Sequence, residues 1–136
     1  MSDTIKLEIV TPDGVVSLED VDMVTLPAVD GQIGVLPMHV PLMTQMVPGE
    51  MIVRKGGQER SLAVGEGFVE ITNDHVAILT DLAVAAENID EAKAEEARQR
   101  AEARLREKLA ADEVAAVNAA LARALAQLRV KRGRRH

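Results

Sequence analysis

Three histidines are the only side chains in the sequence that ordinarily titrate near neutral pH, and they are the first candidates for chemistry: His39, His75 and His136. No two of them fall at the i, i+4 spacing that places a pair of metal ligands on one helix face. The chain has no cysteine, which excludes a thiolate metal site and a cysteine nucleophile. It also contains neither a Gly-x-Ser-x-Gly elbow nor a phosphate-binding loop. We therefore expect a protein that is not an enzyme and needs no metal or cofactor.

His39 lies between two prolines in the apolar segment GQIGVLPMHVPLM, residues 31–43. Pro37 and Pro41 bias the residues before them toward extended backbone, and each removes a hydrogen-bond donor. A strand that carries such prolines belongs at the edge or the end of a sheet. This rigid segment suits a contact surface. The alternatives are a proline-rich connection with an incidental histidine, or a small hydrolase that uses His39.

The charge of the chain divides it into two parts. Residues 1–87 hold 4 Lys and Arg against 14 Asp and Glu, whereas residues 88–136 hold 12 against 8. Such an asymmetry indicates two segments that meet different partners. The acidic part argues against nucleic acid as a ligand, and the single aromatic residue, Phe68, leaves almost nothing to stack on bases. No apolar run approaches the ~20 residues of a membrane helix, and the N-terminus does not resemble a secretory signal, so we expect no direct membrane insertion.

The first part has the sequence pattern of an all-β domain. All 5 prolines and 8 of the 9 glycines lie in it, at the short intervals typical of turns. Period-2 alternation and short apolar runs indicate strands in TIKLEIV, VDMVTLPAV, GVL, PLMTQMV, MIVRK, RSLAV, FVEIT and VAILT. The turns VPGE, KGGQE, VGEG and TNDH supply Gly or Asn where a positive φ is easiest. About eight to ten short strands predict a sandwich or a flattened barrel over residues 1–87.

Residues 88–136 predict two helices. The segment contains 14 alanines and no proline. Asn88 with Glu91 reaching back, or Asp90 one turn later, would cap the first helix, and Asp112 would cap the second. Apolar residues recur at helical spacing as Ala94, Ala97, Ala101, Leu105 and Leu109, and then as Val114, Val117, Leu121, Leu125 and Leu128. The short connection makes the helices antiparallel, which gives an α+β chain: a β-sandwich followed by a two-helix hairpin.

The first of these apolar stripes is poor because alanine buries little surface. At ~25 cal/mol per Å² an alanine seam contributes far less than a leucine seam. A hairpin closed mainly by alanines is marginal alone, and its docking on another element is easily exchanged. It is therefore either a movable arm or an ordinary hairpin that packs permanently on the sheet.

Read together, several segments identify a family. GVLPMHVPLMT, GEGFVEITNDHVAILTD, AENIDEAKAEEARQRAEARL and ALARALAQLRV, in this order, resemble the epsilon subunit of bacterial F-type ATP synthase. The likeness runs from about residue 3 to residue 130. It implies a ten-stranded β-sandwich over 1–87 that joins the gamma subunit to the c-ring of the rotor, and a helical arm over 88–136. It also implies a non-catalytic subunit that couples proton flow to ATP synthesis, at the cytoplasmic face of the cell membrane.

The resemblance assigns roles to particular residues. Gln32 and His39 are expected at the contact with the gamma subunit and the c-ring. The family usually reads Pro-Gly-His-Ala-Pro here, whereas this chain has Met38 and Val40. If the glycine of the family takes a positive φ, then Met38 is strained.

The helical arm of the family inhibits ATP hydrolysis by extending along the gamma subunit into the catalytic α/β head. Basic residues of its last helix are expected to meet an acidic stretch of the catalytic β subunit; the matching residues are Arg123, Arg129, Lys131 and Arg132. A rival interpretation is a stand-alone β-sandwich interaction module whose basic helical tail contacts an anionic partner. Recovery of the chain as a stoichiometric component of a membrane-bound ATPase discriminates between the two.

Some members of the family also bind one regulatory ATP in the folded hairpin. The matching residues are Glu87, Ile89, Asp90, Lys93, Ala94, Arg100 and Arg123. Lys93 stands where arginine is usual, and it keeps the charge but loses the bidentate fork. Gln127 occupies a position where some ATP binders carry another arginine. We therefore expect ATP to bind weakly or not at all.

Overall fold

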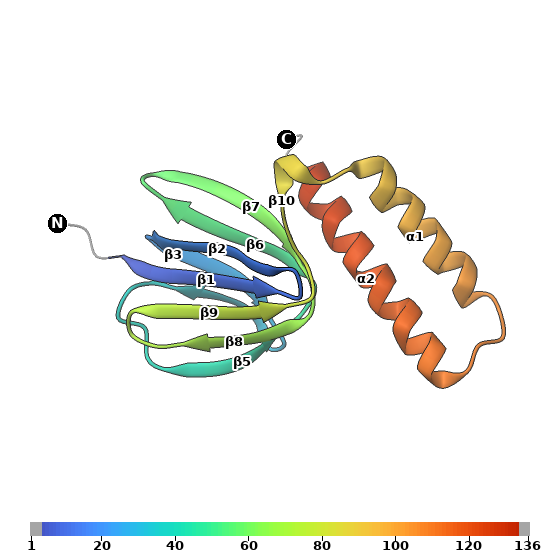
Figure 1. Cartoon of the computed structure of the whole chain (residues 1–136), viewed down its shortest axis with the longest axis horizontal. Helices are drawn as coiled ribbons and strands as arrows, with labels where there is room; N and C mark the ends of the chain where they lie inside the picture. Colours follow the sequence, from blue (N-terminus) through green and yellow to red (C-terminus); the bar gives the residue numbers. More distant parts are fainter. Residues whose placement is uncertain (1–3, 134–136) are drawn as a thin grey trace.

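The computed structural model describes residues 4–133, and it has ten strands followed by two helices (Figure 1). The strands are β1 (Ile5–Thr11), β2 (Gly14–Val21), β3 (Met23–Ala28), β4 (Gly31–Val35), β5 (Leu42–Met46), β6 (Gly49–Lys55), β7 (Gln58–Val64), β8 (Gly67–Ile71), β9 (His75–Thr80) and β10 (Ala83–Ala85). A 3₁₀ turn, η1 (Ala86–Asn88), leads into α1 (Glu91–Leu105) and α2 (Ala111–Gly133). The predicted fold class, a β-sandwich followed by a helical hairpin, is confirmed.

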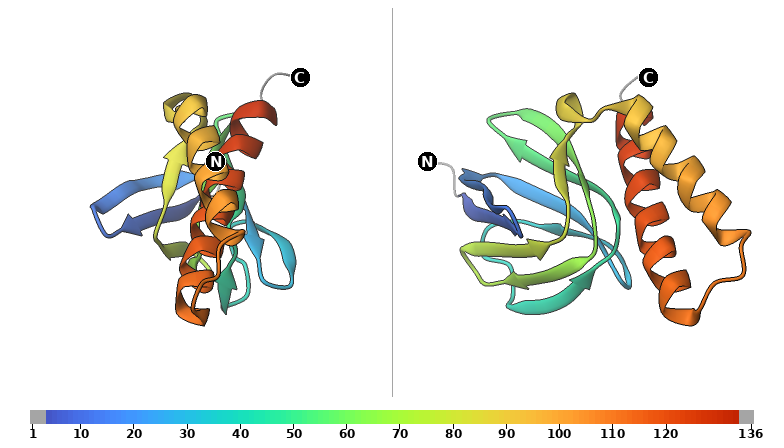
Figure 2. Two further views of the ribbon diagram at one scale, coloured as in Figure 1. Left: turned by 90° about the vertical axis from the view of Figure 1, so that its right-hand side faces the viewer. Right: turned by 45° about the vertical axis from the view of Figure 1, so that its right-hand side comes forward.

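The strands form one continuous sheet that folds over on itself. Their order is β10-β7-β6-β3-β5-β8-β9-β1-β2, with β4 paired to β3 beside this path. Strands β1 and β9 run parallel, and the other described pairs are antiparallel. In the left view of Figure 2 the β1–β2 hairpin, in dark blue, and the β3–β4 hairpin, in light blue, extend to opposite sides of the helices.

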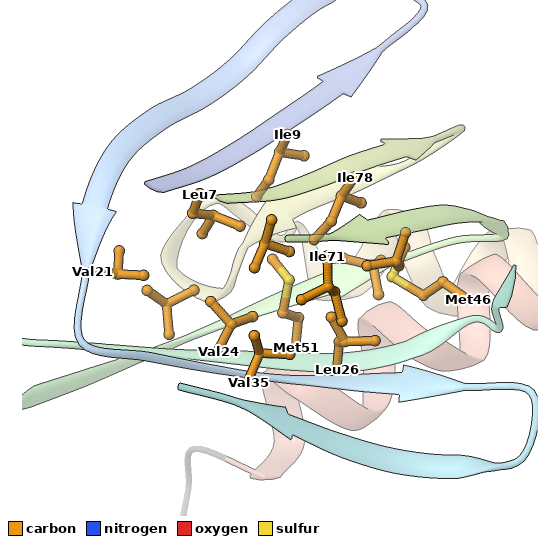
Figure 3. Packing of buried hydrophobic residues seen from close by; sticks show 14 of the residues in the cluster. Leu7, Ile9, Val21, Val24, Leu26, Val35, Met46, Met51, Ile71 and Ile78 are labelled. Atoms are coloured by element: carbon orange, nitrogen blue, oxygen red, sulfur yellow. The ribbon is translucent and has the colours of Figure 1, made fainter. Parts of the chain in front are cut away.

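The main core is aliphatic and consists only of residues from the strands and their connections (Figure 3). In β1, Ile5, Leu7 and Ile9 are buried, as the predicted alternation requires. Their neighbours in the core include Val24, Leu26, Met51, Ile71 and Ile78. No helix residue belongs to this cluster, so the sandwich has a core of its own.

Two strands, β2 and β10, were not predicted from the sequence. In β2 the apolar residues Val15, Val16 and Leu18 are all exposed, so the strand does not alternate between core and solvent. The other, β10, has only three residues, which is too short for a periodic pattern. Both are edge strands of the sheet, where burial on one face constrains the sequence least.

The four predicted turns all lie where consecutive strands are connected, but a positive φ occurs in only one of them. Gly56 and Gly57 in KGGQE have positive φ, but no residue of VPGE, VGEG or TNDH does. In VGEG, Gly67 is required for a different reason, which is the close approach of the β9 backbone. A Cβ built on Gly67 would lie 2.0 Å from the carbonyl oxygen of Leu79 on β9.

The helix starts agree only in part with the sequence. Asp90 caps α1, since its side chain accepts a hydrogen bond from the backbone N–H of Lys93. Asn88 belongs to η1 and is not the cap. Asp112 lies inside the first turn of α2 and is not its cap. The N-terminus of that helix is instead capped by Glu113, whose Oε1 accepts a hydrogen bond from the Ala110 N–H.

Helix α2 lies between α1 and the sandwich, on strands β6 and β7 (Figure 1). The buried residues of α1 are Ala94 and Ala101, which confirms the alanine seam. On α2 the buried residues are Ala124, Ala126, Leu128 and Val130. Leu125 is exposed and Leu109 lies outside α1, so the predicted stripes are wrong at these two positions. Within the described residues, neither helix is long and apolar enough to cross a membrane.

Candidate functional site

The histidines do not assemble a reactive centre. His39 Nδ1 lies 2.6 Å from the carbonyl oxygen of Val40, and His75 Nε2 lies 3.4 Å from Glu8 Oε1. His136 lies outside the described residues. Among the residues from 4 to 133, no group of three His, Asp or Glu side chains is placed to hold a metal ion.

Residues 36–41 form an irregular turn that connects β4 to β5, which agrees with the alternative of a proline-rich connection and not with an edge strand. Met38 has a φ of 69° and is the one non-glycine residue with positive φ in the described part of the chain. Its N–H donates to the carbonyl oxygen of Asn73 at 2.7 Å, which fixes the turn against the β8–β9 connection. The positive φ on which the expected strain at Met38 depended is confirmed. Leu36, Met38 and Val40 expose their side chains here.

The structure does not bring Gln32 and His39 together. Gln32 is the second residue of β4, at the end of the sandwich next to α2, where it lines a cleft of about 280 Å³ with Glu50 and Arg129. His39 follows Met38 at the other end of the sandwich, beside the β8–β9 turn. Gln32 is exposed and His39 is half-buried, and the two residues belong to different surfaces.

A row of apolar side chains on the outer face of the sheet was missed by the sequence analysis. Phe68 on β8 pairs with Leu79 on β9, Leu79 pairs with Val10 on β1, and Val10 pairs with Val15 on β2. Phe68 and Leu79 are each 58% exposed and Val15 is 61% exposed. Val10, between Leu79 and Val15, is half-buried. Contiguous exposed apolar patches on protein surfaces are typical of interaction sites. We call these four residues the outer-face row. The sequence could have indicated it, because each of these strands carries apolar residues at the alternate positions that point away from the core.

Most of the predicted inhibitory cations have partners inside the chain. Arg123 Nη1 lies 3.2 Å from Asp81 Oδ2 of the sandwich. Lys131 Nζ donates to the carbonyl oxygen of Ala86 at 3.2 Å. The Arg132 guanidinium bridges two carboxylates of α1, Glu91 at 3.0 Å and Glu95 at 3.3 Å. Arg129 is exposed and has no carboxylate partner among the described residues.

One of the carboxylates that these cations approach, Glu95, is held in the charged form. A side-chain hydrogen bond from Arg98 lowers the pKa of Glu95 to about 2, and the charge of Arg132 acts in the same direction. The hydrogen bond to Glu91 raises the pKa of Arg132 above its usual value. Both groups stay ionised at neutral pH, so their attraction is permanent there.

Several of the predicted ATP-binding residues have structural roles. Ile89 is buried in a second small core with Ala63, Ala86 and Val130. Asp90 caps α1 and Ala94 is buried in the hairpin.

The charged members of the predicted ATP set are dispersed. Lys93 and Arg100 are exposed on α1, and Arg123 is paired with Asp81. Glu87 lines a cleft of about 390 Å³ that also contains Glu19 and Arg60 of the sandwich. The structure therefore does not gather these cations at one point.

The comparisons with known proteins cover both parts of the chain. Residues 4–86 match the family described as ATP synthase, Delta/Epsilon chain, beta-sandwich domain, and residues 87–132 match its long alpha-helix domain. The chain is 43% identical over 132 residues to the ATP synthase epsilon chain of Herpetosiphon aurantiacus, with 97% of each chain covered. It is 47% identical over 102 residues to that of Bacillus subtilis, covering 75% of this chain and 77% of the relative.

A solved structure agrees over the whole length. A chain in the mitochondrial ATP synthase of Euglena gracilis, described as OSCP/F1/c-ring in rotational state 1, superposes with a TM-score of 0.79 at 25% identity. The match covers 100% of this chain and 84% of the other. The sandwich, the hairpin and the sequence agree, and the chain belongs to the epsilon-chain family of ATP synthases, as a non-catalytic subunit of the central stalk.

Proposed function

We propose that this subunit couples proton flow to ATP synthesis, with the sandwich docked on the gamma subunit and the c-ring and the hairpin acting as a brake on ATP hydrolysis. The observation that carries the proposal is the division of labour in the fold: an independent core with an exposed apolar face, joined to a hairpin that alanines and ion pairs hold in place. Such a subunit works at the cytoplasmic face of the cell membrane as a peripheral component.

The outer-face row is the part of the sandwich that we assign to the gamma subunit. Phe68 and Leu79 are both apolar and more than half exposed, and a few side chains that become buried at the centre of an interface carry most of its binding energy. We assign His39, on the 36–41 turn, and Gln32, at the other end, to separate contacts with the rotor. The separation of the two residues fits a sandwich that touches two partners.

The brake is assigned to the cations of α2, but not to all four at once. At about 100° per residue, Arg129 and Arg132 lie roughly 60° apart around the helix. Arg123 lies about 180° from Arg132 and therefore faces the opposite way. A flat acidic surface on the catalytic β subunit thus reaches Arg129 and Arg132 together, and Arg123 belongs to the contact with the sandwich.

We further propose that regulatory ATP binds weakly or not at all. Arg123, one of the cations that would meet phosphate, is already paired with Asp81, and Lys93 offers a point charge without a fork. A calorimetric titration of the chain with ATP tests this proposal. Micromolar or tighter affinity contradicts it.

The experiment that tests the main proposal is ATP hydrolysis by a catalytic head depleted of its epsilon subunit. The head is titrated with the full chain, with its R129Q/R132Q variant and with residues 1–87, which retain the whole main core. We expect inhibition by the full chain alone and binding by all three.

Two other results point elsewhere. If all three proteins bind and none inhibits, the subunit couples without braking. If none binds, the sandwich is an interaction module for some other partner, and the proposed function fails.

A further inference from the structure

One guanidinium fastens the end of the chain's last helix to the start of the helix before it. Arg132 Nε donates to Glu91 Oε2 at 3.0 Å, and its Nη2 donates to Glu95 Oε2 at 3.3 Å. The two carboxylates are four residues apart on α1, so they lie on one face of that helix. A guanidinium between two carboxylates uses the fork geometry of its donors, which a lysine lacks. The two hydrogen bonds therefore fix the orientation of the Arg132 side chain, in addition to pairing its charge.

The contact is one of several that hold α2, beside the Arg123–Asp81 pair, the bond from Lys131 to the Ala86 carbonyl and the buried Leu128, and it matters because the apolar core under the hairpin is small. The core between the hairpin and the sandwich consists of Ala63, Ala86, Ile89 and Val130, with Val84 packed against it. The buried side chains of α1 are alanines. With so little apolar area to bury, ion pairs contribute a larger share of the docking free energy than they do under an ordinary leucine-rich helix.

We propose that Glu91 and Glu95 form a latch that keeps α2 folded by occupying Arg132, and that a carboxylate-rich partner must displace them before the hairpin extends. Arg129 lies on the same side of α2 as Arg132 and has no carboxylate partner within residues 4–133. It is therefore the cation that such a partner meets first. The biological use of the latch rests on the proposed braking function, but the latch itself is a property of the isolated chain.

Glu95 also serves the helix to which it belongs, which dictates the control. Arg98 binds Glu95 at i, i+3 and Glu102 at i, i+4 within α1. Replacing Glu95 therefore weakens α1 slightly as well as the latch. The E102Q variant removes an ion pair of the same kind from the same arginine but touches nothing in α2, so it measures that side effect alone.

The test uses the absence of cysteine from the chain. A single V130C substitution places a thiol under α2, where the native side chain is fully buried in the small core. The labelling rate of this thiol by a maleimide reports opening of the hairpin. A V69C variant places the thiol in the main core instead and reports global unfolding. Each reporter is combined with E91Q/E95Q, with R132Q and with E102Q.

We expect V130C to label about two- to tenfold faster in E91Q/E95Q and in R132Q, because exposed ion pairs contribute modestly and two are lost. In E102Q the rate stays as in the parent, and V69C is unchanged throughout. Raising KCl from 0.05 M to 1 M screens the attraction between Arg132 and the two carboxylates, so V130C labels faster. The same increase in salt accelerates labelling less when V130C is combined with E91Q/E95Q, because that variant lacks the two carboxylates.

Two results overturn the latch: E91Q/E95Q labels no faster than E102Q, or V69C accelerates equally, which makes the effect global. If the V130C substitution by itself opens the hairpin, the reporter is A124C instead, since Ala124 is also buried on α2. These rates are measured without any other subunit. The latch can therefore fail while the full chain still inhibits ATP hydrolysis, and it can hold while inhibition is absent.

Discussion

At the scale of single residues, Met38 combines an unfavourable backbone with an exposed side chain. Its φ of 69° places a β-carbon in the left-handed region, which costs a non-glycine residue of order 1–2 kcal/mol. Its side chain is 74% exposed, so it recovers little by burial within the chain. The sequence predicted this strain because the family has glycine here, and the strain persists because the Met38 N–H is tied to Asn73.

The M38G variant should therefore be more stable than the parent, by about 0.5–1 kcal/mol once the extra freedom of glycine in the unfolded chain is subtracted. Urea unfolding at neutral pH measures the difference. The matched control is M43G, an equally exposed methionine in the regular strand β5, where glycine should destabilise by a similar amount. A lower urea midpoint for M38G than for the parent contradicts the assignment of strain.

Glu19 closes the gap between edge strand β2 and the β6–β7 hairpin. Its carboxylate contacts Arg60 and, at 3.5 Å, Lys55. The hydrogen bond from Arg60 lowers the pKa of Glu19 from 4.5 to about 2, and burial opposes that shift. The lowered folded-state pKa means that the charged form stabilises the fold above pH 4.5, and that this contribution disappears as the pH falls from 4.5 to 2.

The E19Q variant should lose about 1–2 kcal/mol at pH 7, less than the full shift implies, because the Arg60 side chain is 39% exposed and screened by water. Its stability should also fall less steeply between pH 4.5 and pH 2 than that of the parent. Denaturant unfolding across this range measures both effects. E59Q, which breaks the more exposed pair with Arg54, is the control, and an equal loss in the two variants contradicts the special role of Glu19.

At the scale of elements, helix α2 shows how burial differs from the apolar pattern. The sequence stripe contains both Leu125 and Leu128, which are three residues apart and equally apolar. In the fold Leu128 is 3% exposed and Leu125 is 47% exposed. Alanines at 124 and 126 take the buried positions instead, because a small side chain lets α2 approach its neighbours closely. A periodic pattern does not distinguish these cases when alanine is so frequent.

L128A should cost about 2–4 kcal/mol of hairpin stability, as expected for a buried leucine that leaves a cavity. The sandwich should survive, since Leu128 is not part of the main core. Thermal melting followed by far-UV circular dichroism should then show a helix transition at lower temperature, ahead of the strands. L125A on the exposed face should leave the melt almost unchanged, and equal melts for both variants would refute the packing assignment.

The elements that sequence analysis found are those with one buried face. Strand β1 alternates cleanly, and Asp90 caps α1 where a carboxylate precedes the alanine run. Strand β2 was missed because Val15, Val16 and Leu18 are exposed on an edge strand. Likewise, the cations of α2 were recognised by type, but their partners Asp81, Glu91 and Glu95 depend on how the hairpin folds back, which no local pattern records.

At the scale of the whole molecule, the two oppositely charged parts of the sequence contact each other. Arg123 of the basic hairpin forms an ion pair with Asp81 of the acidic sandwich, so these two charges are already paired within the folded chain. The apolar outer face is different, because nothing in the described chain covers Phe68 or Leu79. We propose that this face meets a second subunit; it lies on the strands β8-β9-β1-β2, which are separate from the hairpin.

An F68E/L79E variant should therefore lose binding to the gamma subunit by about 30-fold or more, since two interface anchors are replaced by buried charges. Its fold should persist, because neither side chain contributes to the main core. Affinity for an epsilon-depleted catalytic head, measured by calorimetry beside a thermal melt, tests both statements. V29E carries a new charge at another exposed apolar position, in the β3–β4 turn, and should bind as the parent does. Normal binding by F68E/L79E, or equal loss by V29E, would show that the gamma subunit docks elsewhere on the sandwich.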